Sequence, residues 1–182
     1  METSTLHPFL RQGLDILFIG LNPATGSSRN RHYFSVNQAF WNQLFSAGLI
    51  TAKIGKEKAD LTVFGSTSIN AHNWQYGITD LVVTIADSSS KSVRPTAVDC
   101  ERLIKEIVQF DPRIAVLLHS KVRDCLARFL GRSSIPTEGY LGQWVRGADT
   151  EFFSVPFPHG NSIGSDRKVE LYRGIAEYVL AH

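Results

Sequence analysis

The chain has 182 residues, 43% hydrophobic and 20% charged, and its 19 basic and 17 acidic side chains give a formal net charge of +2. This length and composition are typical of one globular domain and exclude a disordered, collagenous or coiled-coil protein. The near balance of charge permits nucleic-acid binding without indicating it, because phosphate contacts need a clustered basic face. We expect one domain over residues 1–182, with its core at about 14–180.

Apolar runs and cysteines set further limits. No apolar stretch approaches the roughly 20 residues of a bilayer span, and residues 1–12 lack the layout of a signal peptide. We therefore expect an intracellular, cytoplasmic protein that is monomeric and binds no membrane. Cys100 and Cys125 are too few for a disulfide scaffold, a four-cysteine zinc site or an iron–sulfur cluster. We interpret both as small buried side chains in helices.

The first half of the chain predicts a strand, a helix and an extended segment. Residues 14–21 (LDILFIGL) form a short apolar run, which is typical of a buried parallel strand. In residues 35–47 the apolar side chains recur at helical spacing. A weaker pattern predicts a short helix at about 56–64, and the β-branched residues 77–85 (GITDLVVTI) predict an extended segment. Residues 86–95 (ADSSSKSVRP) are predicted to form a loop.

The second half predicts helices that alternate with strands. Thr96 and Asp99 predict a capped helix that ends before residue 112, and a strand follows at 113–119. Ser120 is then predicted to cap a helix that turns Phe129 inward. A strand at 151–157 and a helix from about 166 complete the chain. This alternation predicts an α/β fold with three α/β/α layers and a mainly parallel central sheet.

Two loops are the places to search for a site, because ligands bind beyond the carboxyl ends of parallel strands. Residues 22–34 (NPATGSSRNRHYF) follow the first predicted strand, and residues 156–162 (PFPHGNS) follow the last. The first loop is longer than the roughly two to six residues usual for such a connection, which favours a functional role. It matches neither glycine-rich phosphate-binding pattern, so we do not expect a nucleotide cradle.

Four segments together resemble the uracil-DNA glycosylase superfamily: GLNPATGSS (20–28), HYFSVNQAFW (32–41), YGITDLV (76–82) and VPFPHGNS (155–162). The chain is most similar to the mismatch-specific uracil/thymine branch, over about residues 14–179, and least similar at 51–75. The resemblance implies the α/β/α fold of that superfamily. It also implies an enzyme of base excision repair that flips a deaminated base out of DNA and hydrolyses its N-glycosidic bond, with no metal or other cofactor.

The resemblance implies roles for two residues of the loops. Asn22 would hold the water that attacks C1′ of the deoxyribose, since an amide both accepts and donates hydrogen bonds. His159 would face O2 of a pyrimidine and stabilise the anionic leaving base. Asp80 is the nearest carboxylate of a strand, and we hypothesise that it assists the water or supports the sugar cation. Without a lysine in the first loop to form a Schiff base, we expect a monofunctional enzyme.

The resemblance also implies contacts to the base and to DNA. The base pocket would contain Gly20, Leu21 and a stacking aromatic residue, which is Phe34 or, as the alternative, Tyr33. The loop expected to enter the minor groove contains Gly160, Asn161 and Ser162. The basic side chains near the crevice that could contact phosphates are Arg29, Arg31, Arg94, Arg167 and Lys168, and scattered surface charge is the alternative interpretation.

Several alternatives stay open at this point. Asn22 before Pro23 is also typical of a plain turn, and the histidines show no metal-like spacing. The related branch usually has an Asn-Pro-Ser-Gly second motif, whereas this chain has His159, and Asn161 stands where a bulkier wedge is common. Uracil is the leading substrate, with hypoxanthine and xanthine as alternatives. Other functions are an inactive nucleic-acid-binding domain of the same fold, an enzyme acting on free nucleosides, or a Rossmann-like binder, which the missing glycine fingerprint disfavours.

Overall fold

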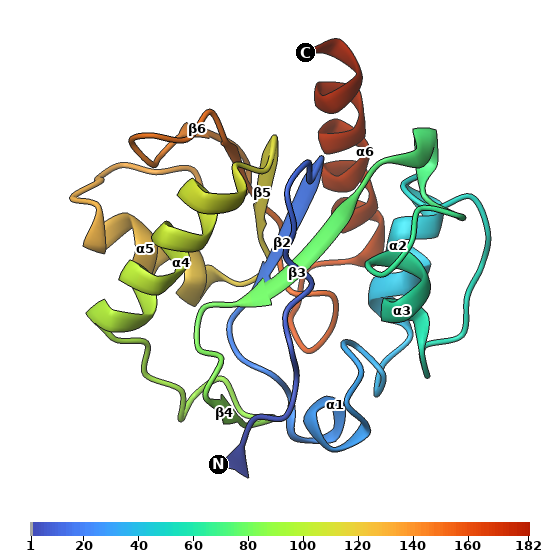
Figure 1. The fold of residues 1–182 in the computed structure, drawn as a ribbon, viewed down its shortest axis with the longest axis horizontal. Coiled ribbons are helices and arrows are strands. Elements are labelled where there is room, and N and C mark those ends of the chain that lie inside the picture. Colours follow the sequence, from blue (N-terminus) through green and yellow to red (C-terminus); the bar gives the residue numbers. More distant parts are fainter. Residues whose placement is uncertain (1) are drawn as a thin grey trace.

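The computed structural model describes residues 2–182 and contains a five-stranded sheet with helices on both faces (Figure 1). The strands are β1 (Glu2–Thr3), β2 (Ile16–Gly20), β3 (Tyr76–Asp80), β4 (Ile85–Ala86), β5 (Ile114–Leu117), β6 (Gly139–Gln143) and β7 (Glu151–Ser154). The helices are α1 (Thr25–Asn30), α2 (Ala39–Ser46), α3 (Ala59–Val63), η1 (Ala71–Asn73), α4 (Ala97–Phe110), α5 (Ser120–Phe129) and α6 (Ser165–Ala181).

The sheet is mainly parallel, as the alternation of elements predicts. Its strand order is β3-β2-β5-β7-β6, in which β2, β3, β5 and β7 run parallel and β6 pairs antiparallel with β7. Strand β6 (GYLGQ) was not predicted from the sequence, because this edge strand lacks an apolar run and includes two glycines with positive φ. The short strand β1, which pairs with β4 outside the main sheet, was not predicted either.

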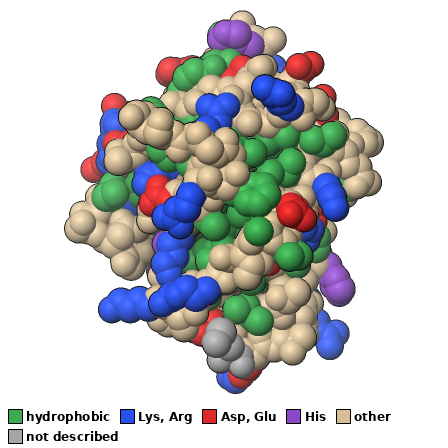
Figure 2. Space-filling view, turned by 90° about the vertical axis from the view of Figure 1, so that its left-hand side faces the viewer, with side chains coloured by type: hydrophobic (Ala, Val, Ile, Leu, Met, Phe, Trp, Pro, Cys, Tyr) green, Lys and Arg blue, Asp and Glu red, His purple; other side chains and the backbone are tan. Residues whose placement is uncertain are grey.

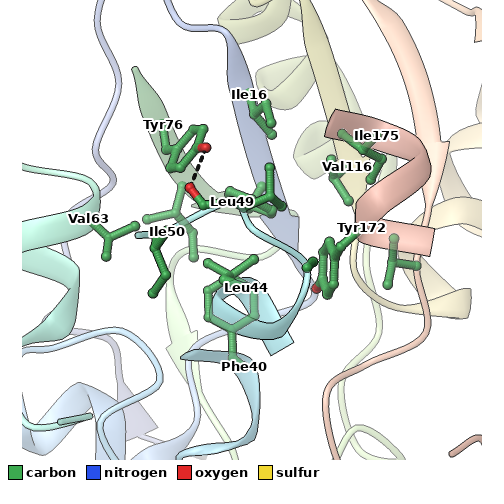
Figure 3. Close-up of a cluster of buried hydrophobic side chains, with 14 of the residues drawn as sticks. Ile16, Phe40, Leu44, Leu49, Ile50, Val63, Tyr76, Val116, Tyr172 and Ile175 are labelled. Atoms are coloured by element: carbon green, nitrogen blue, oxygen red, sulfur yellow. Dashed lines mark hydrogen bonds between the residues drawn. The ribbon is translucent and has the colours of Figure 1, made fainter. Parts of the chain in front are cut away.

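Helices bury both faces of the sheet. Alternate residues of β2 point to opposite faces, so the strand contributes to both clusters. Ile16 and Phe18 join the cluster packed under α2 and α6, part of which Figure 3 shows. Leu17 and Ile19 join the cluster under α4 and α5. In the first cluster, the Tyr76 hydroxyl donates to the Leu49 carbonyl at 2.8 Å. The three-layer expectation is therefore confirmed. No helix within residues 2–182 is long and apolar enough to cross a membrane.

The predicted cap of α4 is confirmed. The Thr96 hydroxyl accepts a hydrogen bond from the Asp99 N–H, and the Asp99 carboxylate accepts one from the Thr96 N–H. This capping box satisfies backbone donors that would otherwise lack partners in the first helical turn. The helix ends where Asp111 adopts a left-handed conformation, with φ of 40°, immediately before Pro112.

Three local predictions were wrong. The cap of α5 is His119, whose Nδ1 accepts from the Lys121 N–H at 3.0 Å, and Ser120 is the first helical residue. Phe129 is 39% exposed because it is the last residue of α5, at the end of the helix. The predicted 22–34 loop contains helix α1, whose weak helix formers (TGSSRN) give little sequence signal. Tertiary contacts hold this helix, including a hydrogen bond from the Thr5 N–H to the Ser28 hydroxyl at 3.0 Å.

Candidate functional site

The parallel strands β2 and β3 end side by side at the site. Gly20 and Asp80 are partners in the register, at the last position of each strand. A Cβ atom on Gly20 would lie 2.2 Å from Asp80 Oδ1, so a residue with a side chain at position 20 would displace the carboxyl group. The absence of a side chain at position 20 thus lets the carboxyl group approach the end of β2.

Asp80 is a buried carboxyl group with unusual acidity. Its residue is 4% exposed, and its Oδ2 atom has no hydrogen-bond partner within residues 2–182. Burial raises the pKa of Asp80 to about 7, although the Arg102 charge and the Tyr33 hydroxyl act in the opposite direction. The Arg102 guanidinium also donates to the Leu81 carbonyl at 2.9 Å, just after the end of β3. A carboxyl group with this pKa exchanges its proton near neutral pH.

Asn22 lies two residues beyond the end of β2 and is half-buried. Its amide nitrogen donates to the Pro23 carbonyl at 2.9 Å and to the Asp87 carbonyl at 2.8 Å. These two bonds orient the side chain, and no hydrogen bond within residues 2–182 uses its Oδ1 atom. A held amide with a free acceptor can receive a hydrogen bond from a water molecule.

Aromatic contacts join the first loop to the second. The Phe34 ring stacks on Phe40 with centroids 4.1 Å apart, and the Phe157 ring lies 6.1 Å from Phe34. Phe157 in turn lies 5.0 Å from the His159 ring and 6.1 Å from the His119 ring. The structure therefore brings Phe34 next to the loop that carries His159.

Tyr33 has a different environment from Phe34. It is buried, its N–H donates to Asp60 Oδ2 at 2.8 Å, and its ring meets the Phe9 ring edge-on at 6.4 Å. Burial, followed by the Asp80 charge, raises the pKa of the Tyr33 hydroxyl, which is therefore neutral at pH 7. Tyr33 thus lies on the Asp80 side of the site, whereas Phe34 lies on the side of the second loop.

The second loop is supported from beneath. The Pro158 carbonyl accepts hydrogen bonds from Gln43 Nε2 at 3.0 Å and from Lys168 Nζ at 3.2 Å. Partial burial and the nearby Lys168 charge lower the pKa of His159, so its imidazole is neutral at pH 7. Lys168 is itself buried, and its ammonium group faces the protein. An ammonium group that faces the protein is not free to contact a phosphate, which argues against the predicted phosphate contact of Lys168.

The tip of the second loop carries an apolar side chain that sequence reasoning missed. Asn161 folds back on the loop, where its Nδ2 donates to the Phe157 carbonyl at 2.8 Å and its Oδ1 accepts from the Ile163 N–H at 3.2 Å. Gly160 and Ser162 are exposed, and Ile163 is 38% exposed. The available signal was the single large apolar residue in the segment HGNSIGS.

The candidate phosphate contacts differ in their freedom. Arg31 is exposed, and within residues 2–182 its side chain makes no salt bridge. Arg167 is paired with Glu138 at 2.7 Å and with Glu170 at 2.6 Å. Figure 2 shows Lys and Arg side chains gathered on the lower left of one face, beside a stretch of hydrophobic side chains.

A cavity of about 450 Å³ lies between the N-terminal segment and the first loop. Its lining consists of Thr5, Leu6, His7, Phe9, Arg31, Tyr33 and Asp60.

No group of three or more His, Cys, Asp or Glu side chains within residues 2–182 has the arrangement of a metal site.

A family model described as the Uracil DNA glycosylase superfamily matches residues 7–175, a range that contains both loops and every strand of the central sheet. A search of curated proteins finds no match.

Proposed function

Because the chain belongs to the uracil DNA glycosylase superfamily, we propose that it hydrolyses the N-glycosidic bond of a deaminated base in DNA, with uracil as the leading substrate. The base is flipped out of the duplex, and the product is an abasic site. The observation that carries the proposal is Asn22 at the end of β2, with its amide nitrogen held and its Oδ1 free. The proposed reaction does not require that the chain belong to the mismatch-specific uracil/thymine branch of the superfamily.

Asn22 positions the attacking water in this proposal. The water donates a hydrogen bond to Oδ1, and its lone pair faces C1′ of the deoxyribose. Breaking the N-glycosidic bond builds positive charge on the sugar and negative charge on the departing base. A correctly placed water therefore needs only weak activation. The two hydrogen bonds from Nδ2 fix the direction of Oδ1 before substrate arrives.

His159 stabilises the departing base. A neutral imidazole donates an N–H to O2 of the pyrimidine as charge develops there, without carrying a charge into the site beforehand. The lowered pKa of His159 supports this form at neutral pH. The contacts of Phe157 with Phe34 and His159 support a site that the two loops share.

Asp80 contributes to the sugar side of the reaction. Its position opposite Gly20 and its pKa of about 7 suit a group whose carboxylate form either accepts a proton from the water or supports the sugar cation. Asp80→Asn should lower the single-turnover rate of base release, because an amide does neither. An unchanged rate in a folded variant would remove Asp80 from the mechanism.

The flipped base stacks on an aromatic side chain of the first loop. Phe34 is our first choice, because its ring adjoins the second loop, and Tyr33 is the alternative on the Asp80 side. Gly20 and Leu21 supply the backbone wall of the pocket, where the absence of a side chain at position 20 admits the Asp80 carboxyl group. Phe34→Leu and Tyr33→Leu separate the choices, because each variant removes one aromatic ring and only loss of the stacking ring should weaken binding of the flipped base.

The second loop enters the minor groove. Gly160, Asn161 and Ser162 form its exposed tip, and Ile163 supplies the apolar wedge that fills the space left by the flipped base. Asn161 is a poor wedge because its amide is occupied by the loop's own backbone. Arg31, which belongs to the first loop, contacts a phosphate of the DNA.

The test is abasic-site formation on labelled DNA. The protein is incubated with EDTA on single-stranded DNA and on duplexes that carry uracil opposite guanine or adenine, and strands are then cleaved with alkali. We expect cleavage by the wild type and strongly reduced cleavage by Asn22→Ala. If the protein acts only on hypoxanthine or xanthine, the proposed reaction stands and the substrate base is not uracil. Binding to DNA without cleavage of any of these substrates would overturn the proposal in favour of an inactive DNA-binding domain.

A further inference from the structure

Two thiols meet between helices α4 and α5. Cys100 Sγ and Cys125 Sγ lie 3.7 Å apart, although the residues are 25 positions apart in the sequence. They are the two cysteines of the chain, and both are free. A disulfide bond has a length of about 2.0 Å, so the sulfur atoms need to approach by only about 1.7 Å.

The two thiols differ in their access to solvent. Cys100 is buried, whereas Cys125 is half-buried and packs against the same apolar cluster from α5. Burial raises the pKa of the Cys100 thiol, which disfavours its thiolate. An oxidant from solvent therefore reaches Cys125 first, and Cys100 stands ready as the second thiol.

We propose that Cys100 and Cys125 form a reversible disulfide when the protein meets a peroxide, which makes this helix pair a redox modification site. The Cys125 thiolate attacks one peroxide oxygen, the O–O bond breaks, and the leaving hydroxide takes a proton to become water. The product is a sulfenic acid on Cys125. Cys100 then attacks that sulfur, the S–O bond breaks, and the hydroxyl group leaves with the Cys100 proton as a second water. The two thiols thus lose two electrons and two protons to the peroxide.

The disulfide would join the helices that hold the segment beside the site. Arg102 on α4 donates to the Leu81 carbonyl at 2.9 Å, and Lys121 on α5 donates to the Val93 carbonyl at 3.3 Å. Between these two anchors, the Asp87 carbonyl accepts the hydrogen bond from Asn22. Cross-linking α4 to α5 should therefore make this segment harder to open. Disulfide formation itself is independent of the proposed glycosylase activity.

The experiment counts free thiols by intact mass. The folded protein is treated with hydrogen peroxide, the peroxide is removed with catalase, and the chain is denatured and alkylated with iodoacetamide. We expect untreated protein to take up two alkyl groups, treated protein to take up none while staying a monomer on a non-reducing gel, and dithiothreitol to restore both. Persistence of two alkylated thiols, addition of oxygen without a link, or a linked dimer would each overturn the proposal.

Single-cysteine variants test the order of events. Cys100→Ser should accumulate a sulfenic acid on Cys125 that dimedone captures, because no second thiol resolves it. Cys125→Ser should react with peroxide more slowly, since its remaining thiol is buried. Faster capture in Cys125→Ser than in Cys100→Ser would contradict the assignment of Cys125 as the thiol attacked first.

Discussion

The loops after β2 and β7 are held in different ways. In the loop after β2, Ser27 and Ser28 are buried, Ser28 is bonded to the N-terminal segment, and Asn22 is bonded to the Asp87 carbonyl. In the loop after β7, residues 159–164 are exposed, and the hydrogen bonds of Asn161 within residues 2–182 stay inside its own loop. A fixed first loop suits the positioning of a reacting water, and an exposed second loop suits entry into DNA.

The largest expected effect comes from the fixed loop. Asn22→Ala should lower the single-turnover rate of base release by about 10²–10³-fold, the cost typical of losing one positioned polar group at a reacting centre. Rapid-quench measurement under excess enzyme reads this rate. The matched control is Asn30→Ala on the same loop, whose amide donates to the Ser35 hydroxyl, and this variant should keep its rate. Equal losses in both variants would indicate general damage to the loop.

The buried carboxyl group at the end of β3 should be visible in the pH dependence of stability. Because the pKa of Asp80 is raised from 3.8 to about 7, the folded state binds more protons than the unfolded state between these values. The stability it contributes is therefore present below the lower value and is lost as pH rises through the upper one. The quantity to compare is the free energy of unfolding of Asp80→Asn minus that of the wild type. This difference should be more positive at about pH 8 than at about pH 4, by on the order of 2–4 kcal/mol.

Urea denaturation at several pH values measures this difference. Asp87→Asn is the control, since hydrogen bonds from the Ser89 N–H and the Ser92 hydroxyl lower the pKa of that exposed carboxyl group. The stability that Asp87 contributes is present at high pH and lost as pH falls, so its variant should show a change of the opposite sign. A pH-independent difference between Asp80→Asn and wild type would contradict a buried, ionising Asp80.

The tip of the exposed loop, unlike His159 at its start, should matter only when the DNA is paired. Ile163→Ala should slow base release from duplex DNA by about tenfold, because a smaller side chain cannot fill the space left by the flipped base. Single-stranded DNA has no stack to hold open, so its rate should stay unchanged. Ser162→Ala, at the neighbouring exposed position, is the control. A loss on both substrates would place Ile163 in the base pocket instead of the groove.

The smallest effect concerns charge. Arg31→Ala should weaken DNA binding and reduce the slope of log K against log salt by about one, as expected for the loss of one phosphate contact. Arg167→Ala should leave the slope unchanged, because its guanidinium is paired with Glu138 and Glu170. Fluorescence anisotropy at several salt concentrations compares them. A larger change in slope for Arg167→Ala would reverse this assignment.

Sequence reasoning located the loops because apolar runs mark buried strands, and the ends of parallel strands lie together. It placed β2 and the start of α4 correctly for these local reasons. It missed β6, whose glycines and exposed positions carry no apolar pattern. The burial of Lys168 could not be read from the sequence, since its partner is a loop carbonyl ten residues away that only the turn of the chain brings near.

The proposed division between the two loops is tested most directly by one ratio. For Asn22→Ala and Ile163→Ala, the single-turnover rate relative to wild type is measured on single-stranded and on duplex DNA of the same sequence. We predict that the Asn22→Ala loss is the same on both substrates, whereas the Ile163→Ala loss is confined to the duplex. A loss for Asn22→Ala that disappears on single-stranded DNA would contradict the assignment of the attacking water to Asn22.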